Sequence, residues 1–90
     1  MDAGTMLKRA ENVTFETVAD EAILIRLDTG TYFSLNKVGT HFWQMLDGQE
    51  TIGQQAATIA NQYEVDVDMV LDDLLELAHE LREEELVTEL

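Results

Sequence analysis

The alternation of apolar and polar residues predicts three short strands in the N-terminal part of the chain. They span about Val13–Thr17, Ala22–Leu27 and Thr31–Leu35, and each shows the period of two that is typical of β structure. Asp20-Glu21 can form the first turn, and Asp28-Thr29-Gly30 is typical of a hairpin turn because glycine tolerates positive φ. Such short connections favour a three-stranded antiparallel meander with its first and third strands at the edges.

The third predicted strand has two different faces. Its period of two places Phe33 and Leu35 on one face, which we assign to the core together with Phe42, and places Tyr32 and Ser34 on the other face. Because this strand is expected at the edge of the sheet, its outer backbone groups are free to pair with another chain. This free edge is the first candidate for a binding site.

Three helical patterns follow the strands. The first runs from about Lys37 to Leu46, after Asn36 as an N-cap. The second begins at Thr51, where Thr51-x-x-Gln54 fits a capping box. The third begins near Asp66 or Asp68 and runs to about Glu84. We therefore predict an α+β fold, with an N-terminal three-stranded antiparallel sheet followed by three helices.

Length and composition indicate one small domain. The chain has 90 residues, of which 46% are hydrophobic, so it should fold around a modest core. We expect residues 1–11 to form a flexible N-terminus and residues 12–90 to form the single domain. There is no cysteine, which excludes disulfides and thiol chemistry. No segment is long and apolar enough to span a membrane or to act as a signal core, so a cytoplasmic protein is expected.

The charge is strongly negative and narrows the choice of partners. Five Lys and Arg residues stand against 19 Asp and Glu residues, which gives a net charge of −14. This field repels nucleic-acid phosphates and anionic membrane surfaces, so we expect neither as a partner, and it favours a cationic one. A winged-helix transcription factor or adaptor is the rival at the level of the fold, but the longest helix carries mostly acid where a recognition helix needs basic or amide side chains.

The sequence offers no set of residues for catalysis or metal binding. His41 and His79 fall on different predicted helices, and neither is accompanied by a nucleophile or an oxyanion motif. Asp66-Val67-Asp68 resembles the start of a calcium loop, but Leu71 stands where glycine is required and Leu77 where a bidentate glutamate is required. We therefore expect a protein that is not an enzyme and that has no metal and no cofactor.

The third helix carries more apolar surface than one contact requires. Beside an ordinary core stripe, Leu71, Leu75 and His79 form a second line at i, i+4 and i+8. One interpretation is a wide buried face. The other is the wall of a trough beside the free strand edge, where an extended peptide adds as a fourth strand. The acids expected to rim this trough and to meet basic residues of the peptide are Asp72, Asp73 and Glu76.

The order of several short motifs resembles a known family. The motifs are Tyr32-Phe33-x-Leu35-Asn36, Val38-Gly39, Trp43, Leu46-Asp47-Gly48, Thr51-Ile52 and Leu86-Val87. Over roughly Val13–Val87 the chain resembles the PqqD-like family, the peptide-recognition domains of ribosomally made, modified peptides. One position departs from the pattern, because many members have a glycine just before the final Leu-Val, where this chain has Glu84-Glu85.

The resemblance implies a winged-helix-like fold that binds the leader peptide of a precursor between the third strand and the third helix. The leader would add as a strand antiparallel to the third strand. Carried over to this sequence, strand pairing falls to Thr31, Tyr32, Phe33, Ser34 and Leu35. The helix side falls to Leu71, Asp72, Leu75, Glu76 and His79.

Within the family, the Tyr-Phe-x-Leu-Asn pattern with Trp43 looks most like the stand-alone leader-binding proteins of lasso-peptide biosynthesis. That likeness implies delivery of the leader to a transglutaminase-like leader peptidase, with a cyclase as a further partner. A PqqD-type peptide chaperone for pyrroloquinoline quinone, or for another radical-SAM modified peptide, stays open as an alternative, although the Pro-Glu typical of the former is absent. A monomer and a homodimer both stay open, because exposed edge strands sometimes exchange between copies.

Overall fold

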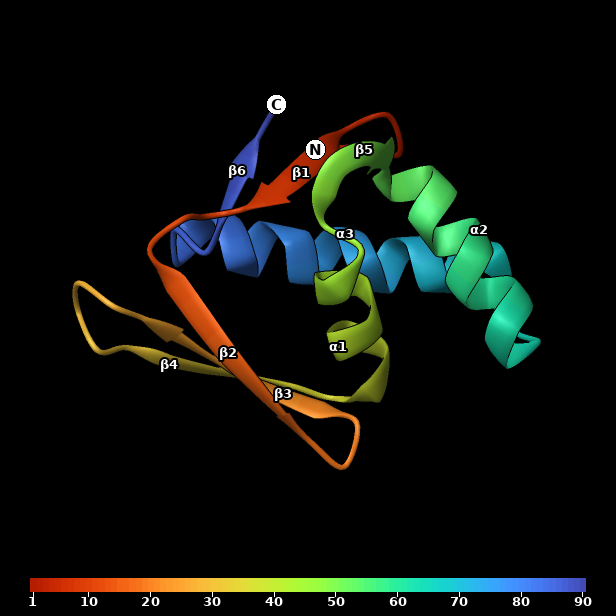
Figure 1. The fold of residues 1–90 in the computed structure, drawn as a ribbon. Helices are drawn as coiled ribbons and strands as arrows, with labels where there is room; N and C mark the ends of the chain where they lie inside the picture. Colours follow the sequence, from red (N-terminus) through yellow and green to blue (C-terminus); the bar gives the residue numbers. More distant parts are fainter.

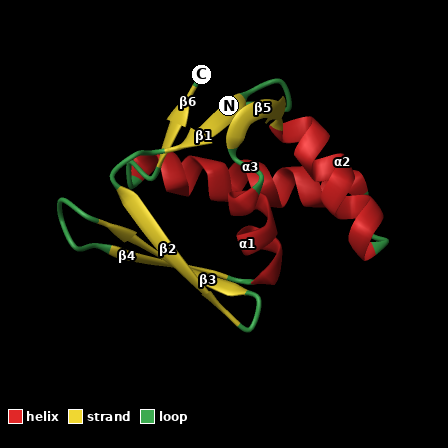
Figure 2. Ribbon diagram, in the orientation of Figure 1, coloured by secondary structure: helices red, strands yellow, loops and turns green.

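The computed structural model describes residues 1–90 as two small antiparallel sheets and three helices. In Figure 1 the long helix α3 crosses the middle of the molecule, with one sheet above it and the other below. Both ends of the chain lie at the upper sheet (Figure 2). The elements are β1 (Met6–Arg9), β2 (Val13–Val18), β3 (Glu21–Arg26), β4 (Tyr32–Leu35), α1 (Lys37–Gln44), β5 (Asp47–Thr51), α2 (Ile52–Tyr63), α3 (Val67–Glu83) and β6 (Val87–Glu89).

The predicted meander is confirmed as the sheet β2-β3-β4. Its strands are antiparallel, and the register pairs Phe15 with Leu24 and Leu24 with Phe33. Gly30, at the β3–β4 turn, has a φ of 73°, as its place in the turn predicts. Both β2 and β4 are edge strands, so the free edge that the sequence predicts for the third strand is confirmed.

The faces of β3 differ from what its hydrophobicity suggests. Ile23, Ile25 and Leu27 share one face because of the period of two, but that face points away from the core, and Leu27 is 66% exposed. Ala22 and Leu24, on the opposite face of β3, are buried instead. The sheet therefore keeps an apolar outer face in contact with solvent.

A second sheet, with the order β5-β1-β6, was not predicted. We expected residues 1–11 to be flexible, but within that segment β1 is the central strand of this sheet, and Leu7 is fully buried. Hydrogen bonding along both of its edges orders this part of the terminus. Leu86 and Val87 are buried in the core, and Val87 begins β6.

Local capping fixes where each helix starts. The Asn36 side chain accepts a hydrogen bond from the Gly39 N–H at 2.9 Å, which satisfies a free donor of the first turn of α1. Thr51 and Gln54 form the predicted capping box of α2, with both reciprocal bonds present. Asp66 caps α3. Because these bonds are local, the sequence predicts them reliably.

The core lies between the two sheets and the three helices. It is a cluster of 17 buried hydrophobic residues, with Trp43 and Phe42 as the largest. The Trp43 ring meets Phe15 edge to face, with ring centroids 5.8 Å apart. Phe42 and Leu35 are in the core, as predicted, whereas Phe33 is only partly buried at its margin. No helix combines the length and the apolar character that a membrane span requires.

Candidate functional site: a groove between β4 and α3

The outer edge of β4 offers unpaired backbone groups at alternate residues. The N–H of Arg26 donates to the carbonyl of Thr31 at 3.0 Å, so these two residues form a hydrogen-bonded pair. In an antiparallel ladder such pairs alternate along the strand, which makes Phe33 the next β4 residue bonded to β3. Tyr32 and Ser34 therefore direct their N–H and C=O groups toward the open side. Two residues thus provide up to four main-chain hydrogen bonds for an added strand.

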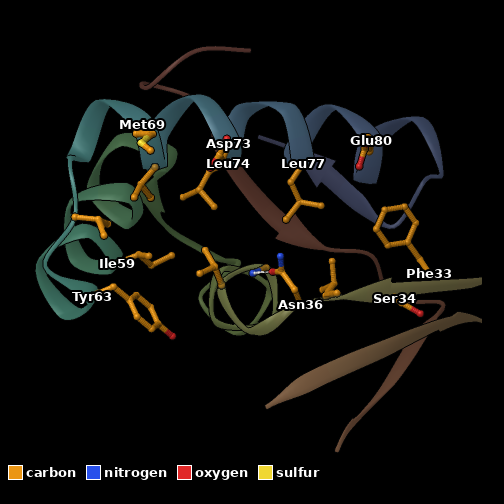
Figure 3. Close-up of a pocket in the computed structure, with 15 residues that line it drawn as sticks. Phe33, Ser34, Asn36, Ile59, Tyr63, Met69, Asp73, Leu74, Leu77 and Glu80 are labelled. Carbon is orange, nitrogen blue, oxygen red and sulfur yellow. Dashed lines mark hydrogen bonds between the residues drawn. The ribbon is translucent and has the colours of Figure 1, made fainter. Parts of the chain in front are cut away.

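A mostly apolar cavity of about 720 Å³ adjoins this edge. In Figure 3 side chains from β4, α1, α2 and α3 converge on it. Tyr63 and Ile59 close its α2 side, and Phe33 stands at the opposite end, beneath α3. The residues that α3 contributes are Met69, Val70, Asp73, Leu74, Leu77 and Glu80. The cavity is wide enough for a large side chain of a bound molecule.

Gly39 allows α1 to approach α3 closely at the floor of this cavity. A Cβ at Gly39 would lie 3.2 Å from Cδ2 of Leu77 and 3.4 Å from Cδ2 of Leu35. A larger residue there would crowd Leu77, whereas its contact with Leu35 would be an ordinary one. The glycine of the Val38-Gly39 motif thus has a structural reason, because a side chain there would press on Leu77.

The groove continues past Phe33 into an acidic hollow. This second space of about 390 Å³ is lined by one aromatic ring and four polar side chains, namely Phe33, His79, Glu80, Glu83 and Glu84. His79 lies 3.3 Å from Glu83, from Nε2 to Oε1. Phe33 and Glu80 line both spaces. The site therefore changes along β4 from apolar, beside Leu35, to acidic, beside Phe33.

Arg26 fastens the β3–β4 hairpin to the C-terminal end of α3. Its guanidinium donates to the carboxylate of Glu85 at 2.9 Å and also to Asp28 in the turn. The hydrogen bond from Arg26 lowers the pKa of Asp28 below its ordinary value of 3.8, and the same bond raises the pKa of Arg26. This contact helps to fix the acidic end of the groove because it ties the hairpin to the residues that directly follow α3.

The five strand residues that the sequence predicts for the site come together along one edge. Tyr32 and Ser34 expose backbone groups at the edge, and the Tyr32 side chain is 71% exposed on the outer face. Phe33 and Leu35 face the cavity. Thr31 lies just before β4, where its carbonyl is already bonded to Arg26.

The helix residues that the sequence predicts lie mostly on other sides of α3. Leu71 and Leu75 are partly buried against the core, and they do not line the cavity. Asp72 and Glu76 are exposed and line neither space. His79 does line the acidic hollow. Periodicity finds the apolar width of a helix but does not determine which flank faces β4.

The α3 residues that do face β4 include two that the sequence reasoning missed, Leu77 and Glu80. Asp73, which was expected at the rim, lines the cavity with them. The three residues follow one another at i, i+4 and i+7, which is the spacing of one helix face. The sequence contains that spacing, but one apolar residue between two acids is also typical of an ordinary solvent-exposed helix face. The pattern alone therefore does not indicate a binding site.

Other polar clusters do not form a comparable site. Lys37 lies over the Tyr63 ring, with its Nζ 5.7 Å from the ring centroid, and His41 meets the same ring at 6.3 Å between centroids. These side chains border a shallow polar hollow on α1 and α2. No group of three or more His, Asp or Glu side chains is arranged to hold a metal ion.

The comparisons with known proteins match most of the chain. Residues 21–87 match the family model of PqqD, the coenzyme PQQ synthesis protein D. The structure is similar to that described as "TbiB1 in Complex with the TbiA(beta) Leader Peptide", with a TM-score of 0.80 and 32% sequence identity. That similarity covers 89% of this chain and 93% of the other. No curated protein matches the chain.

Proposed function

The chain belongs to the PqqD family, and from this premise we propose that it binds the leader peptide of a ribosomally made precursor by strand addition at β4. The leader's main chain bonds to Tyr32 and Ser34, and alternate leader side chains enter the groove beneath α3. The observation that carries this proposal is the free edge of β4 beside an apolar cavity of about 720 Å³. The 32% identity to TbiB1, described in complex with a leader peptide, supports it.

The protein presents the bound leader to a processing enzyme and performs no chemistry itself. In a lasso-peptide pathway this enzyme is a separate leader peptidase of the transglutaminase-like class, with a cyclase acting on the released core. Strand addition suits such a role, because main-chain bonds hold the leader extended while the rest of the precursor stays accessible. The motif Tyr32-Phe33-x-Leu35-Asn36 with Trp43 is what favours this pathway.

A second candidate is a peptide chaperone for the precursor of pyrroloquinoline quinone. The family model that matches the chain favours it, because that model describes a coenzyme PQQ synthesis protein. The two candidates share the groove and differ in the peptide. Calorimetric titration with a lasso leader and with a PQQ precursor, side by side, separates them through the ratio of the two dissociation constants.

The strand-addition step is tested by removing one backbone donor. Ser34→Pro deletes an N–H that points to the open edge, where proline is tolerated, so the domain should stay folded. Thr17→Pro is the matched control, because by the same alternation Thr17 directs its N–H to the open edge of β2. In calorimetric titrations with the leader we expect Ser34→Pro to raise the Kd about tenfold or more and Thr17→Pro to leave it unchanged. A folded Ser34→Pro variant that binds the leader with wild-type affinity would contradict the proposal.

A further inference from the structure

We infer that the leader carries a large apolar residue followed, two positions later, by lysine or arginine. This inference rests on the proposed function and adds the chemistry and the order of the recognised residues. It combines two observations. The first is which residues of β4 direct their backbone hydrogen-bonding groups to the open edge, and the second is that the groove lining changes from apolar to acidic along β4.

The phase of β4 determines which leader side chains face α3. Because Tyr32 and Ser34 supply the hydrogen bonds, the leader residues opposite Phe33 and Leu35 form the non-hydrogen-bonded pairs. Side chains in such pairs lie closest together and on the same face of the sheet. The two leader residues opposite Phe33 and Leu35 therefore both point into the groove.

The leader residue opposite Leu35 meets apolar surface. Leu35 is buried, and Val38 and Leu77 beside it are only partly buried, so they offer carbon to an incoming side chain. The cavity continues from this point toward Tyr63 and Met69, which leaves room for an aromatic or long aliphatic side chain. Burying such a side chain stabilises the complex by about 1.5–3 kcal/mol.

The leader residue opposite Phe33 meets carboxylates. Glu80, Glu83 and Glu84 line the hollow there, and of their carboxylates only that of Glu83 lies close to a basic side chain, with its Oε1 3.3 Å from His79 Nε2. No lysine or arginine lines this hollow. A leader lysine or arginine can lay its aliphatic stem along the Phe33 ring and bring its charge to these acids. Charge complementarity therefore selects a basic residue at this position.

The direction of the leader sets the order of the two residues. The sheet β2-β3-β4 is antiparallel throughout, and an antiparallel fourth strand continues that pattern with the more stable hydrogen bonds. A leader running antiparallel to β4 passes Leu35 first and Phe33 two residues later. The recognised pattern is thus apolar-x-basic, and a parallel leader would read basic-x-apolar.

Selection from a library of displayed random twelve-residue peptides tests this pattern. We expect the wild-type chain to enrich apolar-x-Lys/Arg, and the charge-swapped variant Glu80→Lys/Glu83→Lys to enrich apolar-x-Asp/Glu. Glu11→Lys/Glu50→Lys, which makes the same charge change away from the groove, should select as the wild type does. In a synthetic copy of a selected peptide, changing the basic residue to glutamate should weaken binding to the wild type about tenfold, and the charge-swapped variant should restore it.

The outcomes separate this inference from the proposed function. Peptides that lose affinity for Ser34→Pro but show no preference for a basic residue would overturn the inference and leave strand addition in place. Enrichment of basic-x-apolar would overturn the antiparallel order. Selected peptides that bind Ser34→Pro as well as the wild type would contradict the proposed function itself.

Discussion

Four residues other than glycine adopt the left-handed backbone conformation, and each lies at a turn or a helix end. They are Ala19, Asp20, Glu64 and Glu85. Glu85, with a φ of 57°, falls just before the final Leu-Val, where many family members have glycine. The exposed ion pair of Glu85 with Arg26, worth about 0–1 kcal/mol, offsets at most part of the strain of a side chain at this position. The departure from the family pattern thus contributes a contact that helps hold the hairpin to α3.

Glu64 has the same strain without a compensating partner. It caps α2 with a φ of 55°, and its side chain makes no ion pair. Glu64→Gly should therefore raise the free energy of unfolding by about 0.5–1 kcal/mol, measured by urea denaturation. Gln62→Gly, on an exposed turn inside the same helix, is the control and should lower it by a similar amount. A destabilised Glu64→Gly variant would contradict the assigned conformation.

The Arg26–Asp28 pair gives the hairpin a pH dependence of known sign. The pKa of Asp28 is lowered in the folded protein, so its contribution to stability is complete at neutral pH. That contribution is lost as the pH falls below the ordinary value of 3.8, toward the folded pKa. The urea midpoint of Asp28→Asn should therefore be lower than that of the wild type at pH 7, and the difference should be smaller at a pH below 3.8. An unchanged difference at both pH values would contradict this pairing.

At the scale of elements, the sequence predicts what depends on local chemistry. The strands β2, β3 and β4 follow from their period of two and their turns, and α1, α2 and α3 follow from apolar spacing and N-caps. The sheet β5-β1-β6 escapes prediction for two reasons. Its strands are short and partly polar, and its pairs join residues far apart in the chain, such as Leu7 with Glu89.

The strand β1 should contribute strongly to stability despite its place at the terminus. Leu7 is fully buried in the core, so Leu7→Ala should lower the free energy of unfolding by about 2–5 kcal/mol. Met6, its neighbour on the exposed face, is 37% exposed, and Met6→Ala should cost less than about 1 kcal/mol. Chemical denaturation monitored by Trp43 fluorescence measures both. If both variants lower the free energy of unfolding by the same small amount, then β1 is not packed onto the core.

The rotation of α3 about its axis is the feature on which the sequence reasoning and the structure differ most. The rotation is set by packing of Leu74, Ala78 and Leu81 into the core. Their spacing predicts this core stripe, but it does not determine which flank of the stripe faces β4. As a result Leu77, and not Leu75, faces β4. Amphipathic spacing alone allowed either flank to form the groove wall.

Leu77 and Leu75 provide a matched pair for testing this rotation. Both are partly buried leucines on the same helix, so both alanine variants should lose some stability. We expect only Leu77→Ala to weaken leader binding, by about tenfold, because only Leu77 lines the cavity. Calorimetric titration of both variants with the leader measures this difference. If only Leu75→Ala weakens leader binding, then the groove wall is formed by Leu75, as the sequence suggested, and not by Leu77.

Taken as a whole molecule, the chain joins a free strand edge to a strongly acidic body. The charge of −14 disfavours phosphate-rich partners and favours basic peptides on electrostatic grounds. The fold adds the position of the apolar and acidic surfaces relative to the free strand edge. Two spaces meet at Phe33, one apolar and one acidic, and both run alongside the edge of β4.

Amide hydrogen exchange at single-residue resolution, with and without a saturating leader peptide, tests strand addition at β4 most directly. The amides of Tyr32 and Ser34 point to the open edge, so they should exchange quickly in the free protein and slowly in the complex. The outward amides of β2, at Phe15 and Thr17, should not change. Protection that appears on β2, or a leader that binds without slowing exchange at Tyr32 and Ser34, would contradict strand addition at β4.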